Sequence, residues 1–243
     1  RDARDEVARL ILDHDPDVVG LQEALRNQLD DLGKALPACG EIGVGRNDGK
    51  TKGEYAAILY RKERFKVVDS GTFWLSDTPD VPGSKSWGNR ITRICTWAIL
   101  MERSSGLSFS IYNVHLDHES QPSREMSAWL LAKRAHSAMM VGPVIVTGDF
   151  NAGESNPAVA TMKVGEAGFV DSFRACHPGD EPPGTFNDFG HDKGSKEKID
   201  YIWVQRRAKV ESAGIDRRSK DGHFPSDHYA VWAKLTVPDK GEP

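Results

Sequence analysis

The side chains that could do chemistry in this sequence are carboxylates, amides and imidazoles placed where apolar runs begin or end. Strand ends converge at one edge of a sheet, so side chains beside them can form one site. Scattered carboxylates without a cysteine motif predict a Mg²⁺ or Mn²⁺ site rather than structural zinc, because hard cations prefer oxygen ligands. The residues in such positions are Glu23, His115, Asp149 with Asn151, and Asp227 with His228.

The segment Gly148-Asp149-Phe150-Asn151 follows a short apolar strand. Strand alternation directs Asp149 and Asn151 to one side and Phe150 to the other. The carboxylate could deprotonate a water, and the amide could donate hydrogen bonds to that water or to a phosphate oxygen. The alternative is a surface turn, because Asp, Asn and Gly are ordinary turn residues.

The segment Ser226-Asp227-His228 places two titratable groups before a predicted strand. Burying either group is costly unless it has a partner. One interpretation places Asp227 near a metal and lets His228 donate to a phosphoryl oxygen, with Asp200 orienting its ring. The other interpretation is a loop cap followed by a core histidine that backbone groups satisfy.

Residues 113–118, NVHLDH, alternate between polar and apolar, so Asn113 and His115 share one face. His115 could bind the scissile phosphate, and Asn113 is a weaker candidate for the same role. The last polar residues of this segment fit the solvent-facing side of an edge strand equally well. Arg93 and Arg124 could each bridge two phosphate oxygens, although single arginines are more often surface residues.

The elements that must position these groups form one sheet-rich domain. Apolar periodicity predicts helices at residues 1–12, 25–36 and 123–140, and a short helix that begins at Asn156-Pro157. It predicts strands at residues 18–21, 55–60, 65–75, 93–101, 107–115, 143–147, 199–204 and 229–235, with hairpins at 55–75 and 93–115. Loops are expected at residues 78–89 and 177–198.

Composition limits the class of protein. A chain of 243 residues with 38% hydrophobic and 28% charged residues is typical of a soluble globular domain. No apolar run approaches the roughly 20 residues that cross a bilayer, so we expect a soluble protein without a membrane span, and a monomer. The net charge of −4 argues against the strong positive field of a non-specific DNA binder.

The sequence opens without methionine, inside a helical pattern, which suggests that further sequence precedes position 1. It therefore neither reveals nor excludes a signal peptide, and it assigns no cellular compartment.

Five motifs along the chain, in this order, resemble those of the endonuclease/exonuclease/phosphatase superfamily. They are LQE at residues 21–23, NVHL at 113–116, GDFN at 148–151, IDY at 199–201 and SDH at 226–228. The segments GTFWLS at residues 71–76 and RICTW at 93–97 are similar to a bacterial branch of this superfamily that is related to its deadenylase-like members.

The resemblance implies an α+β fold, a four-layer αββα sandwich in which two mostly antiparallel sheets pack face to face with helices outside. It implies a single domain over residues 1–243 that lacks the family's first strand and the asparagine which that strand carries.

The resemblance also implies hydrolysis by in-line attack of water on phosphorus, with Mg²⁺ as cofactor. The implied roles are metal binding by Glu23, water activation by Asp149, phosphate contacts from Asn151 and His115, and charge stabilisation by the Asp200 and His228 pair.

Three functions are consistent with these residues. The leading hypothesis is a phosphodiesterase acting on nucleic acid, because basic stretches at residues 193–198 and 217–220 flank the motifs, although such runs are more often solvated loops. The second is a phosphatase or phosphodiesterase for a small-molecule or lipid phosphoester, which the acidic net charge favours. The third is a catalytically inactive binding module that keeps the fold.

Overall fold

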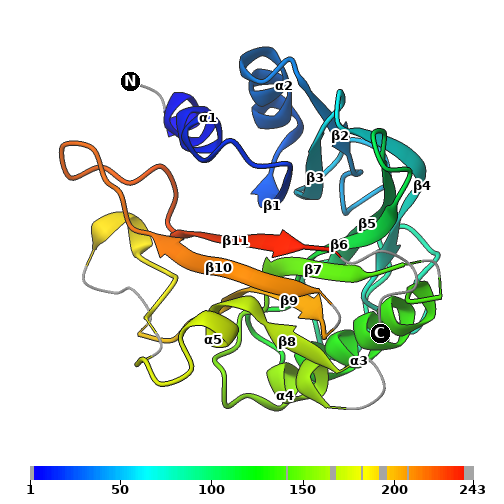
Figure 1. Cartoon of the computed structure of the whole chain (residues 1–243). Coiled ribbons are helices and arrows are strands. Elements are labelled where there is room, and N and C mark those ends of the chain that lie inside the picture. The colour runs from blue at the N-terminus through cyan, green and yellow to red at the C-terminus, as the bar shows by residue number, and fades with distance from the viewer. Residues whose placement is uncertain are drawn as a thin grey trace.

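The chain folds into four layers, with helices outside two layers of strands (Figure 1). The computed structural model describes residues 3–140, 142–164, 168–181, 183–191, 196–206 and 208–237. The helices are α1 (Ala3–His14), α2 (Arg26–Ala35), α3 (Gln121–Ala138), α4 (Pro157–Lys163), α5 (Ser172–Cys176) and the 3₁₀ turn η1 (Asp188–Gly190). The strands are β1 (Val18–Ala24), β2 (Cys39–Ile42), β3 (Tyr55–Arg61), β4 (Phe65–Trp74), β5 (Ile94–Glu102), β6 (Ser108–His115), β7 (Val144–Asp149), β8 (Phe169–Asp171), β9 (Asp200–Gln205), β10 (Lys209–Asp216) and β11 (Ala230–Thr236).

One six-stranded sheet forms an inner layer, in the order β4-β5-β6-β7-β9-β8. Its pairs are antiparallel except for β6 and β7, which are parallel. The facing layer contains the three-stranded sheet β1-β3-β2 and the hairpin β10-β11. Strands β1 and β3 contact the middle of the large sheet, and β11 contacts β9. The predicted α+β sandwich of mostly antiparallel sheets is therefore confirmed.

Apolar side chains fill each gap between the layers. Between the sheets, Ile58 of β3 packs with Ala98, Leu100 and Ile111 of the large sheet. On the outer face of the large sheet, a larger cluster joins the strands to α3 and α4. A third cluster joins β1 and β3 to α1 and α2. The central strands bury residues on both faces, which explains why their sequences read as continuous apolar runs.

The helices on the outer faces begin at capping residues that the sequence shows. The Ser120 hydroxyl accepts a hydrogen bond from the Ser123 N–H at the start of α3, and the Asn156 side chain accepts one from the Ala158 N–H at the start of α4. The Asn156-Pro157 prediction is therefore confirmed.

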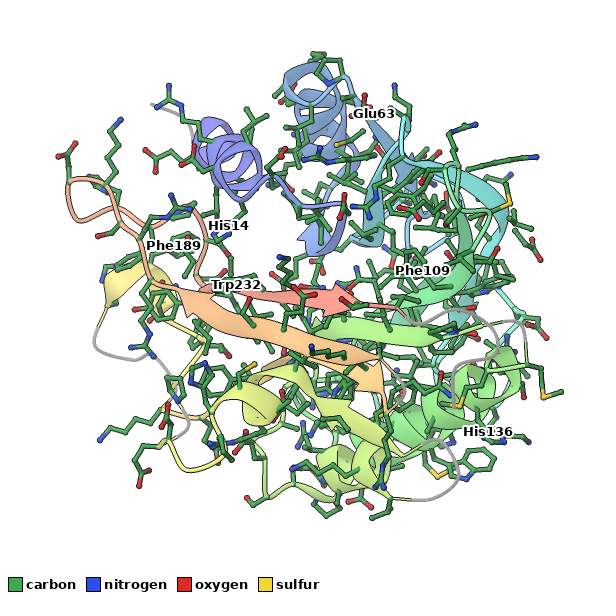
Figure 2. All side chains as sticks on the ribbon, viewed as in Figure 1. His14, Glu63, Phe109, His136, Phe189 and Trp232 are labelled. Carbon is green, nitrogen blue, oxygen red and sulfur yellow. The ribbon has the colours of Figure 1, made fainter. Side chains whose placement is uncertain are left out.

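Helix α1 also contacts the β10-β11 hairpin. His14 of α1 lies beside Trp232 of β11, with ring centroids 6.2 Å apart (Figure 2).

The hairpin predicted over residues 55–75 is wrong. Strand β3 pairs with β1 and β2, whereas β4 pairs with β5, so the short turn between them carries the chain from one sheet to the other. This crossing lets Ile58 and Phe65 enter the same core between the sheets. The hairpin at residues 93–115 is confirmed by the β5 and β6 pairing. Strands β2, β8 and β10 and helix α5 were not predicted.

None of the described helices has both the length and the apolar character that crossing a membrane requires.

Candidate active site

The predicted strand-end residues come together at one end of the facing layers. His115 ends β6, Asp149 ends β7 and Asp200 begins β9, and these three positions are neighbours in the large sheet. From the opposite layer come Glu23 near the end of β1 and His228 just before β11. The convergence that the sequence predicted is therefore present in the structure.

Asp149 is held by the turn that follows it. Its Oδ1 accepts a hydrogen bond from the Asn151 backbone N–H at 2.7 Å, and its Oδ2 accepts one from the Asn151 side-chain amide at 3.2 Å. Asn151 has a φ of 47°, a left-handed conformation that is costly for most side chains but tolerated by asparagine. Phe150 points away into the core, as strand alternation predicted.

The Asp149 carboxyl is almost fully buried, with 5% of the residue exposed. Burial and the neighbouring Asp200 carboxylate raise the pKa of Asp149 to about 7. A carboxylate with such a pKa is a stronger base than an ordinary aspartate and is still partly ionised near neutral pH.

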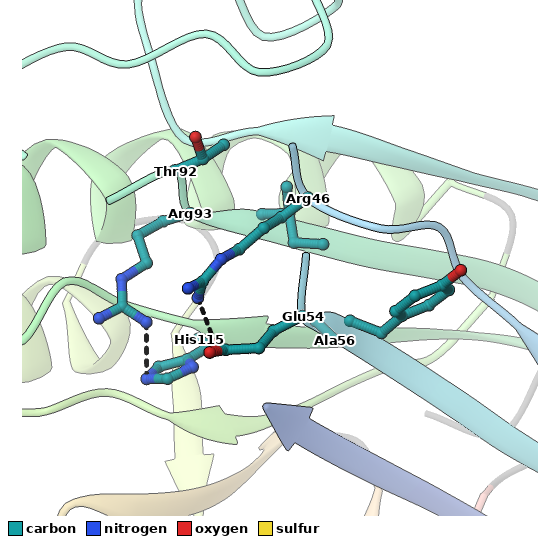
Figure 3. Close-up of a pocket in the computed structure, with 8 residues that line it drawn as sticks. Arg46, Glu54, Ala56, Thr92, Arg93 and His115 are labelled. Carbon is teal, nitrogen blue, oxygen red and sulfur yellow. Dashed lines mark hydrogen bonds and ion pairs between the residues drawn. The ribbon is translucent and has the colours of Figure 1, made fainter. Parts of the chain in front are cut away.

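Arg93 connects two histidines. Its Nη1 donates to His115 Nε2 at 2.9 Å, its Nη2 donates to His118 Nδ1 at 2.6 Å, and its Nε lies 3.5 Å from Asp117 Oδ2. Figure 3 shows the contact between Arg93 and His115. Because a guanidinium can only donate, the facing His115 nitrogen must accept and the ring must be neutral. Burial and the nearby Arg93 charge also favour the neutral ring, because they lower the pKa of His115 well below its ordinary value.

Besides Arg93, three groups lie near Nε2 of His115. Asn151 Nδ2 lies 3.1 Å away, Asp149 Oδ2 3.4 Å and Glu23 Oε1 3.9 Å. The Asn151 amide and the Arg93 guanidinium both lie within hydrogen-bond distance of His115 Nε2. Donors gathered in this way suit an anionic oxygen beside them.

His228 and Asp200 form a second pair. His228 Nδ1 lies 2.9 Å from Asp200 Oδ2, and His228 Nε2 lies 4.0 Å from Asp149 Oδ2. Burial lowers the pKa of His228, but the hydrogen bond and charge of Asp200 and the charge of Asp149 outweigh that effect and raise it to about 9. His228 is therefore a cation at neutral pH, with its Nε2–H directed toward Asp149. The Phe186 ring lies edge-on to the imidazole, with centroids 5.1 Å apart.

Carboxylates gather on the β1 side of the site. Glu23 has a φ of 61° within the irregular end of β1, and its side chain is 61% exposed. Its oxygen lies in one cluster with Glu54 and His115, while Asp149, Asp200 and His228 form a second cluster. Partial desolvation by the surrounding protein, and then the charges of Glu54 and Asp227, raise the pKa of Glu23. Like charges so placed repel each other, which a divalent cation would relieve.

Two of the weaker phosphate-binding candidates lie elsewhere. Asn113 is fully buried between the layers, where its amide donates to Leu21 O and Ala57 O, both at 2.9 Å. Its oxygen accepts hydrogen bonds from Gln22 and Thr147. With these contacts Asn113 cannot also reach a phosphate, so that prediction is wrong. The close approach explains Gly20, because a Cβ there would lie 2.6 Å from the Asn113 oxygen.

Arg124 is also directed away from the site. Its guanidinium donates to the Gln121 side chain and to the Asp117 carbonyl, so it holds the turn that leads into α3. None of these contacts reaches a residue of the site, so the structure does not support the prediction that Arg124 binds phosphate. Arg93, by contrast, lies inside the site.

Sequence reasoning missed Glu54 and Arg46. Arg46 Nη1 lies 2.5 Å from Glu54 Oε2, and both line the recess beside Arg93 and His115 (Figure 3). A signal was present for Glu54, because this carboxylate directly precedes the apolar run of β3 in the same way that Asp227-His228 precedes β11. Arg46 lies in a polar loop without any comparable pattern.

Comparison with known proteins gives one family. The model of the Endonuclease/Exonuclease/phosphatase family matches residues 1–228. A solved endonuclease/exonuclease/phosphatase from Bacteroides vulgatus has 36% identity and a TM-score of 0.90, covering 97% of this chain and 90% of that one. The mannosyl-6-phosphatase Bt3783 of Bacteroides thetaiotaomicron has 35% identity and a TM-score of 0.86, covering 97% of this chain and 91% of that one.

Among curated proteins, the uncharacterized protein L388 of Acanthamoeba polyphaga mimivirus is 29% identical over 155 residues. That match covers 61% of this chain and 58% of the viral protein's length.

Proposed function

The chain belongs to the endonuclease/exonuclease/phosphatase family and is a metal-dependent phosphoesterase, and we propose that its substrate is a small phosphomonoester such as a sugar phosphate. The observation that carries this proposal is the similarity, over nearly the whole of both chains, to a protein named as a mannosyl-6-phosphatase. The compact set of anion-binding groups around His115 supports it.

This proposal reverses the order of the first two hypotheses, because the basic stretch at residues 217–220 is a poor surface for nucleic acid. Arg218 is paired with Asp216 at 2.6 Å and with Asp13 at 3.0 Å. The Arg217 guanidinium donates to Gly184 O and lies over the Tyr229 ring. Part of the other basic stretch, residues 193–195, lies outside the described residues. The net charge of −4 adds no long-range attraction for a polyanion.

Asp149 is the proposed base. Its raised pKa and its position beside Asn151 allow it to take a proton from a water aimed at phosphorus. Asn151 holds both carboxylate oxygens, one through its backbone N–H and one through its side-chain amide, and keeps the base in one orientation. As the bond to phosphorus forms, negative charge develops on the phosphoryl oxygens, and the groups that face them decide the rate.

Arg93, Asn151 and His228 supply the proposed donors to those oxygens. The Arg93 guanidinium is buried and is held by its contacts with His115 and His118. His228 is protonated at neutral pH and can donate from Nε2, while Asp200 fixes the ring through Nδ1. Donors that are already oriented need no reorganisation when the charge develops.

The residues around Glu23 fit a divalent cation. Glu23 and Glu54 are oxygen donors in one cluster, and the charges of Glu54 and Asp227 both act on Glu23. Neither of the two described metal-ligand clusters contains cysteine. Glu23 and Asp227 would hold the ion, with Mg²⁺ as the proposed species and Mn²⁺ as a substitute. When bound, such an ion neutralises phosphate charge and polarises the phosphoryl group.

The test is a hydrolysis panel with Mg²⁺, with Mn²⁺ and with EDTA. It compares mannose 6-phosphate, p-nitrophenyl phosphate, bis(p-nitrophenyl) phosphate, single-stranded DNA and RNA, supercoiled DNA and a choline phospholipid. We expect metal-dependent phosphate release, fastest from the sugar phosphate. Faster cleavage of nucleic acid, with a rate that falls steeply as salt rises, would restore the nuclease hypothesis.

A further inference from the structure

A buried lysine lies just before β9, the strand that begins at Asp200. Lys198 precedes Asp200 by two residues, and its side chain is 1% exposed. An ammonium group in such surroundings is costly unless it is paired. Among the described residues its Nζ lies 2.8 Å from Asp171 Oδ2, 3.7 Å from Glu154 Oε1 and 3.4 Å from the centre of the Tyr201 ring.

Each partner of Lys198 belongs to a different part of the scaffold. Glu154 lies in the loop that leaves Asp149 and Asn151, and Asp171 ends β8, the strand next to β9. Tyr201 directly follows Asp200 in β9. The ammonium therefore ties the loop after β7 to the start of β9.

Further contacts strengthen this connection between the loop after β7 and the start of β9. The Tyr201 hydroxyl lies within hydrogen-bond distance of Ala152 O and Lys198 O, at 2.9 Å and 2.8 Å. The Arg174 guanidinium of α5 holds both oxygens of Glu154, at 2.8 Å and 2.7 Å. Glu154 is therefore paired with two cations, Lys198 and Arg174, which hold it in place.

The link joins the two halves of the site. Asp149 and Asn151 belong to β7 and its following turn, whereas Asp200 orients His228. The 4.0 Å separation of His228 Nε2 from Asp149 Oδ2 depends on how β7 and β9 meet at this end. No described contact of Lys198 reaches the groups that face the proposed phosphate, so its effect must pass through these neighbours.

We propose that Lys198 is a positioning residue for the reaction, whose buried charge fixes the turn carrying Asp149 and Asn151 against the strand carrying Asp200. The inference rests on the proposed roles of those residues. It does not depend on the natural substrate.

The test compares Lys198→Met, which keeps the length but removes the charge, with Lys198→Arg, which restores a cation. Activity is measured with p-nitrophenyl phosphate or its diester, whichever the wild type hydrolyses. A reaction geometry displaced by about 1 Å can cost about 100-fold, so kcat of Lys198→Met should fall by about that factor. KM should stay within about threefold, and Lys198→Arg should recover at least about tenfold of the lost kcat.

Two further variants separate positioning from lost stability. The double variant Lys198→Met/Asp171→Asn leaves no unpaired buried carboxylate at the nearest partner, and it replaces the single variant if that one does not fold. Leu131→Ala truncates the core under α3, which makes it a matched control for lost stability. We expect the folded double variant to lose kcat as the single variant does, and Leu131→Ala to keep it.

The proposal is overturned if folded Lys198→Met, or the double variant in its place, keeps kcat within about threefold of wild type. It is also overturned if Leu131→Ala loses as much kcat, or if arginine restores nothing. A negative result on sugar phosphates would contradict the proposed function alone, because the chromogenic comparison would still stand.

Discussion

His228 Nδ1 lies 2.9 Å from Asp200 Oδ2, although these residues come from opposite layers of the sandwich. The contact directs the other ring nitrogen toward Asp149, and it keeps the imidazole protonated at neutral pH because the Asp200 carboxylate stabilises the charge.

The first prediction concerns this pair. His228→Ala should lower kcat by about 100-fold to 10,000-fold, the usual contribution of a placed proton donor. His177→Ala is the matched control, since His177 also faces a carboxylate, that of Asp180 at 3.1 Å, but is not among the site residues. Steady-state kinetics on the best substrate give the comparison. A loss below tenfold for His228→Ala would remove this residue from the mechanism.

The second prediction is a pH dependence of stability in the metal-free protein. The folded pKa of His228, about 9, lies above its ordinary value of 6.5, so the charged ring stabilises the fold fully below pH 6.5. This stabilisation, on the order of 3 kcal/mol, is lost as the pH rises through about 9. The raised pKa of Asp149 also makes the folding stability fall as the pH rises, but that fall is complete near pH 7. Between pH 7 and 9, the difference between wild type and a His228 variant therefore reports His228, because the raised thiol pKa values of Cys39 and Cys95 affect both proteins.

Urea unfolding at several pH values, with EDTA present, measures this effect. Wild type should lose stability between pH 7 and 9, and His228→Gln should lose much less over the same interval. Parallel curves for the two proteins would show that the pair does not have the proposed charge.

The third prediction separates activity from stability at Asp149. Asp149→Asn should abolish metal-dependent turnover, since an amide cannot take a proton from water. The same change should leave the melting temperature of the metal-free protein unchanged or raised at pH 8, because it removes a charge that burial disfavours. Kinetics and thermal denaturation check the two halves. Retained turnover would exclude Asp149 as the base.

The positions of the site residues could be predicted because each lies at a fixed offset from an apolar run. Strand alternation placed Asn113 and His115 on one face, but it could not show how deep that face is. Gly20 of the opposite layer approaches Asn113 and buries it, while His115 lies further along β6, at the edge. A single strand carries no information about its neighbour in another sheet.

The turn between β3 and β4 shows the same limit. Two strands joined by a short charged turn have the same local sequence pattern whether they pair or enter different sheets. The long-range packing of Ile58 and Phe65 decides between these outcomes. Loop residues such as Arg46 were missed for the same reason, because their role arises only when the loop folds over His115.

The fourth prediction concerns the metal. Mg²⁺ should raise the melting temperature, because binding to the folded state alone adds about 2.7 kcal/mol at a concentration 100-fold above Kd. Glu23→Gln should weaken this effect and the activity together, whereas Glu63→Gln, on the turn between β3 and β4 (Figure 2), should change neither. Thermal denaturation over a Mg²⁺ titration is the measurement. An equal Mg²⁺ shift in Glu23→Gln would exclude that residue as a ligand.

The fifth prediction tests the structural role of Asn113. Its amide joins β6 to Leu21 and Ala57 in the opposite layer, so Asn113→Ala removes two hydrogen bonds between the layers. Each such loss costs about 1–3 kcal/mol, and the unfolding free energy should fall by a similar amount or more. Because this amide is occupied inside the sandwich, kcat per folded molecule should change by less than about threefold. Urea unfolding and active-site-normalised kinetics distinguish the two roles, since a phosphate ligand would lose activity without such a loss of stability.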